Sequence, residues 1–150
     1  MNYTSQVIID APIDKVIILF DNPENMSKWQ EGFISMTLKS GEDRKPGAKY
    51  DMKYKMGKRE IEMVETILEH DLPRIFSATY EAKNMWNQVD NSFHPTEDGK
   101  TLYTTDNTFK MRGMMKIIGI LMPGAFKKQS QKFLNDFKTY VEKEVSNNQL

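Results

Sequence analysis

The chain has 150 residues, the usual size of a single domain, and its 21 Lys and Arg balance its 21 Asp and Glu. This balance provides no bulk charge that would point to nucleic acid or an anionic membrane, and the absence of cysteine excludes disulfides, thiolate metal sites and a cysteine nucleophile. The first residues lack the basic and apolar regions of a signal peptide, so we expect a cytoplasmic protein.

The N-terminal part of the sequence predicts one strand and two short helices. Alternating apolar residues predict a strand over residues 2–10. Pro12 suits the first turn of a helix, where its missing N–H costs nothing, so we expect a helix over residues 12–20. Asn22 is a good N-cap for a second short helix that ends near Trp29.

From residue 33 the apolar residues recur with a period of two. Turn residues divide this part of the chain into six short strands, and consecutive strands joined by turns predict an antiparallel meander. Gly57-Lys58 is the signal of a tight hairpin. The expected strands begin at residue 33, cover 50–56, run from 61 to a break at 71–73, and then cover 76–80, 86–94 and 102–110.

The last part of the chain is predicted to be helical. Apolar residues at spacings of three and four predict a helix from about 125 to 146. The run MMKIIGILMPGAF, residues 114–126, precedes it and is too short and too interrupted to span a bilayer. We expect a short helix near 114–121 and a kink at Pro123-Gly124, which with Gly119 forms either a moving gate or a static kink.

The expected inner faces of the strands are rich in methionine and aromatic residues. One helix is a small cover for a curved sheet, and the space that remains is where a ligand pocket tends to form. Methionine also fills gaps in ordinary cores, so a plain core is the alternative. The residues are Met36, Tyr50, Met52, Tyr54, Met63, Phe76, Tyr80 and Phe93.

Four motifs carry a resemblance to a known family. They are VIIDAPIDKVIILFDNPENMSKWQEGF, Leu72-Pro73-Arg74, Gly99-Lys100-Thr101 and KFLNDFKTYVEKE. In this order they resemble the START-like, Bet v 1-like (SRPBCC) superfamily, in particular its polyketide cyclase/dehydrase and lipid-transport branch. Ile17 departs from the family pattern, in which an aromatic residue is common at that position.

The resemblance implies one START-like domain over residues 1–150 with an α+β helix-grip fold. In that fold a seven-stranded curved antiparallel sheet wraps around a long C-terminal helix, and two short helices follow the first strand. The family binds lipids, sterols, polyketides or other hydrophobic molecules in an apolar cavity. It has no universal catalytic motif, so the resemblance assigns no catalytic residue.

The residues themselves offer few candidates for chemistry. His70 and His94 lack metal-ligand spacing and are expected at turn edges in contact with solvent, so we expect no metal and no cofactor. Glu65 is in phase with Met63 and Ile67, so it either faces the cavity or is turned to solvent by a bulge. In an apolar pocket its pKa would rise and it could act as an acid or base.

Several other polar and aromatic residues have two interpretations. Asn91 and Asn107 either anchor a ligand or bond across the sheet, and Tyr103 can pair a ring with a hydroxyl. Trp29 and Trp86 are either structural or stack on a ligand. Met114, Ile117, Ile118, Leu121, Met122 and Phe126 are interpreted as pocket wall and lid.

The leading hypothesis is a protein that binds a small hydrophobic or amphipathic molecule between the sheet and the last helix, as a monomer or weak homodimer. One alternative is a cyclase- or dehydratase-like enzyme with Glu65 or a pocket tyrosine as acid or base. The other is a protein- or membrane-surface module that uses Lys127, Lys128, Lys132 and the basic hairpin 49–59. The expected ligand-binding residues are Trp29, Met36, Tyr50, Met52, Tyr54, Met63, Glu65, Phe76, Tyr80, Asn91, Phe93, Asn107, Ile117, Leu121, Met122 and Phe126.

Overall fold

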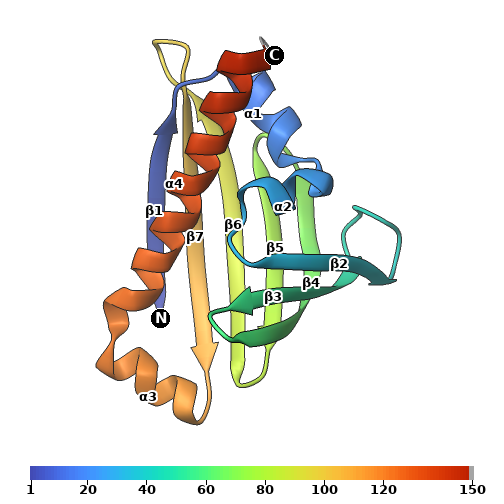
Figure 1. Cartoon of the computed structure of the whole chain (residues 1–150), viewed down its shortest axis with the longest axis vertical. Helices are drawn as coiled ribbons and strands as arrows, with labels where there is room; N and C mark the ends of the chain where they lie inside the picture. The colour runs from blue at the N-terminus through green and yellow to red at the C-terminus, as the bar shows by residue number, and fades with distance from the viewer. Residues whose placement is uncertain (149–150) are drawn as a thin grey trace.

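A computed structural model describes residues 1–148 as one antiparallel sheet gripping a long C-terminal helix (Figure 1). The seven strands lie in the order β1-β7-β6-β5-β4-β3-β2, so each strand after β2 pairs with its neighbour in sequence and β1 closes the far edge on β7. The predicted helix-grip fold is confirmed. The strands are β1 (Asn2–Ile9), β2 (Phe33–Ser40), β3 (Lys49–Met56), β4 (Arg59–Asp71), β5 (Ile75–Ala82), β6 (Met85–Pro95) and β7 (Thr101–Met111).

The short helices follow β1 as the sequence predicts. Pro12 has an extended backbone and α1 (Ile13–Phe20) begins directly after it. The Asn22 side chain accepts a hydrogen bond from the Glu24 amide at 3.0 Å, which satisfies one free donor of the next turn. This cap belongs to a 3₁₀ turn, η1 (Pro23–Asn25), that leads into α2 (Met26–Trp29).

Two helices end the chain, as the sequence predicts. The short helix α3 (Met114–Leu121) stops before Met122, whose φ of −131° and ψ of 60° are not helical. Pro123 then opens α4 (Pro123–Asn148). The predicted kink at Pro123-Gly124 is therefore replaced by a break one residue earlier, because proline disfavours the helical conformation in the residue before it and suits the first turn of a new helix.

The core lies between the inner face of the sheet and the helices, in two clusters. The first joins α1 and α4 to β6 and β7, with Phe137 and Tyr103 fully buried at its centre. The second lies on β3, β4 and β5 around Met52 and Ile67. Phe20 on α1 packs against both. Because α4 packs mainly on β1, the central strands are not covered along their whole length by the helix (Figure 1).

Candidate functional site

A polar row crosses the inner face of the sheet. The strand register pairs Tyr50 with Glu65, Glu65 with Tyr80, and Tyr80 with Asn87. Residues paired directly across antiparallel strands point to the same face. The sequence alternation of each strand thus brings four polar side chains from β3, β4, β5 and β6 side by side in an otherwise apolar surface.

Glu65 is the buried charge of this row. The bulge in β4 lies between Ile67 and Glu69, beyond Glu65, so the carboxyl group faces inward and is only 4% exposed. Burial raises the pKa of Glu65 above its ordinary value, and the hydrogen bond from Tyr80 opposes this shift. Burial and the neighbouring Glu65 in turn raise the pKa values of Tyr80 and Tyr54, so both phenols stay protonated.

The other two tyrosines of the site differ in what their hydroxyl groups do. The Tyr54 hydroxyl donates to Gln30 Oε1 at 2.5 Å and ties β3 to the segment after α2. The Tyr50 hydroxyl donates to Asp43 Oδ1 at 2.6 Å and accepts from the Arg44 amide at 2.7 Å. The hydroxyl of Tyr50 is therefore committed to the loop between β2 and β3.

The amides predicted as anchors are partly committed to the sheet. Asn91 accepts a hydrogen bond from the Tyr103 hydroxyl at 2.6 Å and donates to the Phe76 carbonyl at 3.1 Å. Asn107 donates to Thr105 Oγ1 at 3.3 Å. Asn91 thus bonds across the sheet, which was one of the two expectations, and Asn107 bonds to a neighbour on its own strand.

Three buried side-chain atoms within residues 1–148 lack any hydrogen-bond partner: Ser5 Oγ, Glu65 Oε1 and Asn87 Oδ1. Ser5 lies on β1, in phase with the buried Ile9, and the other two belong to the polar row. Each unpartnered buried polar group costs about 1–3 kcal/mol, so such atoms call for a water molecule or a ligand group. Asn87 and Ser5 were missed in the sequence, although Asn87 is in phase with Asn91 and could have been found.

The apolar candidates divide into core and accessible residues. Met52, Phe76 and Phe93 are buried in the two clusters. Met36, Tyr54, Met63 and Tyr80 lie on the inner face and remain partly exposed. Within this accessible set, Tyr80 lies directly across the sheet from Glu65, and Met63 is its neighbour on the same face of β4.

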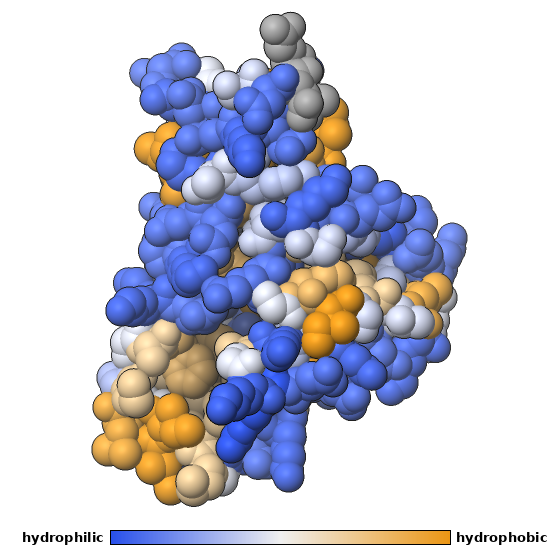
Figure 2. Space-filling view, in the orientation of Figure 1, coloured by the Kyte–Doolittle hydropathy of each residue, from blue (hydrophilic) through white to orange (hydrophobic). Residues whose placement is uncertain are grey.

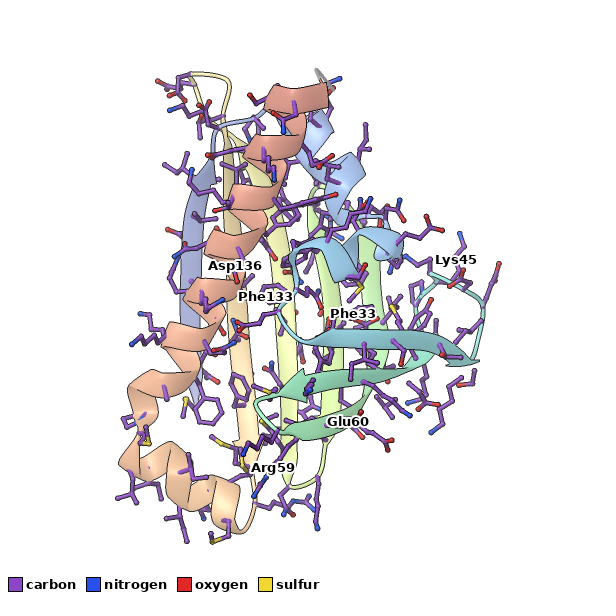
Figure 3. The ribbon with its side chains drawn as sticks, viewed as in Figure 1. Phe33, Lys45, Arg59, Glu60, Phe133 and Asp136 are labelled. Carbon is purple, nitrogen blue, oxygen red and sulfur yellow. The ribbon has the colours of Figure 1, made fainter. Side chains whose placement is uncertain are left out.

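Trp29 and Phe126 are contacts of the long helix. Trp29 packs against Phe133 and Phe137 on α4, with ring centroids 4.6 and 4.8 Å apart. Phe126 is tilted against Phe109 on β7 at 5.2 Å. Figure 3 shows Phe133 on α4 and Phe33 at the start of β2, the two elements that border the accessible part of the inner face.

The run before α4 lies outside this site. Gly119 is the buried residue of α3, and a Cβ at Gly119 would lie 2.7 Å from the Met111 methyl carbon. Because α3 packs on the end of β7 through this glycine, Ile117, Leu121 and Met122 turn outward and are exposed. The structure therefore does not bring these three side chains to the inner face.

His70 lies at the end of β4 and is partly exposed, as expected, but both of its ring nitrogens have protein partners, which the sequence did not indicate. Its Nε2 lies 2.8 Å from Asp21 Oδ1, and its Nδ1 lies 2.6 Å from the Arg44 carbonyl oxygen. Arg44 adopts a φ of 65°, which folds the β2–β3 loop back over the histidine, and its guanidinium also binds Asp21 at 2.7 Å. His94 is exposed, as expected.

Two open hollows lie on the outer face, away from the polar row. One, of about 410 Å³, is lined by residues that include Glu81, Trp86 and Lys110, and the Lys110 ammonium lies 4.6 Å from the Trp86 ring centre. The other, of about 440 Å³, includes Asp51, Lys53 and Glu62 of β3 and β4. Both are lined in part by charged side chains, so they suit an apolar ligand less well than the inner face.

Neither a metal cluster nor a membrane-spanning helix is present in the described part of the chain. No three His, Asp or Glu side chains among residues 1–148 are grouped to hold a metal ion. No helix in the same range is both long and apolar enough to cross a membrane.

Three solved structures illustrate the fold. A conserved protein from Geobacillus kaustophilus is 18% identical, with 96% of this chain and 97% of that chain covered and a TM-score of 0.78. The Zhui aromatase/cyclase from Streptomyces sp. R1128 is 11% identical, with 97% and 95% covered and a TM-score of 0.73. A norcoclaurine synthase point mutant from Thalictrum flavum, in complex with a transition-state analogue, is 11% identical, with 96% and 95% covered and a TM-score of 0.71.

The family itself is established by sequence. None of the curated proteins compared with this chain matches it. The family described as polyketide cyclase / dehydrase and lipid transport matches residues 1–142, which is nearly the whole chain. The structural neighbours are Bet v 1-like (SRPBCC) proteins, as the sequence motifs predict. This chain therefore belongs to the polyketide cyclase / dehydrase and lipid transport family.

Proposed function

We propose that the protein binds a small amphipathic molecule on the inner face of the sheet, between the central strands and α4. The observation that carries the proposal is the pair of unpartnered buried atoms, Glu65 Oε1 and Asn87 Oδ1, on the same polar row. A ligand that supplies a hydrogen bond there removes a penalty of about 1–3 kcal/mol for each atom.

The surroundings define the chemistry of the ligand. Met36, Met63 and the rings of Tyr54 and Tyr80 offer apolar, partly accessible surface on the same inner face as the carboxyl group. Asn87 Oδ1 is an acceptor, so the ligand needs a donor such as a hydroxyl group. We therefore expect a compact apolar body, such as a ring system, that carries at least one hydroxyl group.

The family supports this class of ligand. One structural neighbour is described as an aromatase/cyclase, and another holds a transition-state analogue, so the same fold accommodates small molecules elsewhere. Sequence identity of 11% transfers no residue role to this chain.

Naphthol and naphthalene form a matched pair of probes, because they share the ring system and differ in the hydroxyl group. We expect naphthol to bind at least about tenfold more tightly than naphthalene, since a site built for a hydroxyl rejects the analogue that lacks it. Glu65→Leu should reduce that difference, because it leaves Asn87 Oδ1 as the remaining unpartnered acceptor of the row, whereas Glu60→Leu, on the exposed end of β4, should keep it in full. Equal binding of the two probes by the wild type would contradict the proposal.

Native mass spectrometry of the protein from its own host is the complementary search for the natural ligand.

A second candidate function is acid–base catalysis in the same site. The observation that favours it is the hydrogen-bonded pair of Glu65 and Tyr80, because burial raises the pKa of the Glu65 carboxyl above its ordinary value, the direction that a general acid needs. A cyclisation or dehydration assay with a polyketide-type substrate tests it. Loss of turnover in both Glu65→Gln and Tyr80→Phe, with binding retained, is the expected result for an enzyme.

A further inference from the structure

The helix α3 and Met122, the residue that follows it, expose six large apolar side chains at one end of the molecule. Their exposed fractions run from 40% to 73%, and they form the patch that Figure 2 shows in orange at the lower end of the molecule. Single exposed apolar residues are ordinary, but a contiguous patch marks a docking surface. We call this set the α3 patch; its residues are Met114, Ile117, Ile118, Ile120, Leu121 and Met122.

The packing of α3 explains why these side chains point outward. The helix contacts the sheet through Gly119, whose missing side chain lets Met111 of β7 come close. Because the fully buried residue of this eight-residue helix is a glycine, most of its long side chains are left on the surface. The patch is therefore not part of the core, and it is separate from the polar row around Glu65.

The charged residues that flank the α3 patch in the sequence are all basic. No acidic residue occurs in the sequence between Asp106 and Asp136, a stretch that contains both α3 and the first half of α4. Lys132 in this stretch is paired with Glu31 and Asp136, and Arg112 lines a hollow that also contains Glu81. Lys116, Lys127 and Lys128 are exposed, and none of the ion pairs described for residues 1–148 involves them. We call these three lysines the basic rim.

We infer that the α3 patch docks the protein on the surface of an anionic lipid bilayer, with the apolar side chains in the headgroup–acyl boundary and the basic rim on the lipid phosphates. A short helix with exposed Ile, Leu and Met and flanking lysines has the composition of an interfacial helix. An eight-residue helix is about 12 Å long, so it lies on a bilayer and does not cross it.

Charge favours a bilayer over a second copy of this chain. A symmetric dimer through α3 would bring the two basic rims together, with no acidic side chain in the stretch to offset them. An anionic lipid surface supplies the opposite charge along the whole rim. The proposed docking surface differs from the basic surface expected from the sequence. Lys132 is already paired with Glu31 and Asp136, and the apolar side chains of the α3 patch make up most of the surface.

Sedimentation with vesicles tests the inference. We expect the protein to bind vesicles of phosphatidylcholine with phosphatidylserine and to bind pure phosphatidylcholine much less. Ile120→Ser with Leu121→Ser should weaken binding at least about tenfold, because two buried aliphatic side chains are lost. Each of Lys116→Gln and Lys127→Gln should weaken it about fivefold, and added salt should act in the same direction.

Two matched controls keep the test specific. Ile18→Ser removes an aliphatic residue that is 61% exposed on α1, and Lys143→Gln removes an exposed charge near the other end of α4; neither should change vesicle binding. Thermal melting checks that every variant is folded.

The inference is overturned if the wild type binds neither vesicle, if the α3 variants bind as the wild type does, or if sedimentation without vesicles shows a dimer that the α3 variants disrupt. Naphthol binding, measured without vesicles, should be unchanged in these variants, so failure of this inference is distinguishable from failure of the proposed ligand site.

Discussion

Replacing Glu65 by Gln should make the protein more stable at neutral pH. The change keeps the shape of the side chain and an acceptor for the Tyr80 hydroxyl, but it removes a buried charge with one unpartnered oxygen. A buried carboxylate costs more than a neutral amide of the same shape, by about 1.4 kcal/mol for each unit by which burial raises the pKa, and the melting temperature of a domain of this size moves by roughly 3 °C for each kcal/mol. We therefore expect Glu65→Gln to raise the Tm by about 3–9 °C at pH 7.

The effect should depend on pH in a defined direction. Burial raises the pKa of Glu65 in the folded state, so the unfolded carboxyl loses its proton at a lower pH than the folded one. Below about pH 4 both states are protonated and the wild type has no penalty. Between the two pKa values the wild type loses about 1.4 kcal/mol of stability for each pH unit as the pH rises, and above the folded pKa the loss is complete.

Thermal melts of the wild type and Glu65→Gln at a series of pH values measure this directly. The Tm difference should be small at pH 4 and grow toward pH 7. Glu60→Gln is the control, because Glu60 lies on the same strand but is exposed. A Glu65→Gln variant that behaves like Glu60→Gln at every pH would refute the reasoning that Glu65 is a buried, poorly compensated charge.

Three further predictions concern the frame of the site. Gly32 has a φ of 79° and a Cβ there would lie 2.1 Å from the Lys55 carbonyl oxygen, so Gly32→Ala should lower the free energy of unfolding in urea by more than about 2 kcal/mol. Gly124→Ala meets no atom within 4 Å in the first turn of α4, so it should stabilise by roughly 0.5–1 kcal/mol and leave naphthol affinity unchanged. Tyr80→Phe removes the hydrogen bond that holds down the pKa of Glu65, so it should destabilise by about 1–3 kcal/mol at pH 7 and less at pH 4. Slower naphthol exchange in Gly124→Ala would instead point to a moving gate at the start of α4.

The fold could be predicted because its signals are local and agree with one another. The two-residue period of the strands, Asn22 as a cap and the long apolar stripe of α4 each specify one element, and the turns between strands leave a meander as the simple arrangement. The same alternation put Glu65 in phase with Ile67, and its inward position depended only on where the β4 bulge falls.

The parts that could not be predicted depend on contacts far apart in the sequence. The ring nitrogens of His70 bond to Asp21, at the end of α1, and to the backbone of Arg44, and the residues beside the histidine indicate neither partner. The direction of α3 depends on a single glycine against Met111, so an apolar run that resembles a pocket wall faces outward. The unpartnered state of Asn87 is likewise visible only once the neighbouring strands are in place.

The most direct test of the ligand site is the methyl NMR spectrum of methionine-labelled protein during addition of naphthol. Met36 and Met63 lie on the inner face near Glu65, whereas Met114 and Met122 belong to the exposed α3 patch. The proposed site predicts that the Met36 and Met63 resonances shift and saturate together, while those of Met114 and Met122 stay in place. Shifts confined to Met114 and Met122, or no saturable shift at Met63, would contradict a binding site between the sheet and α4.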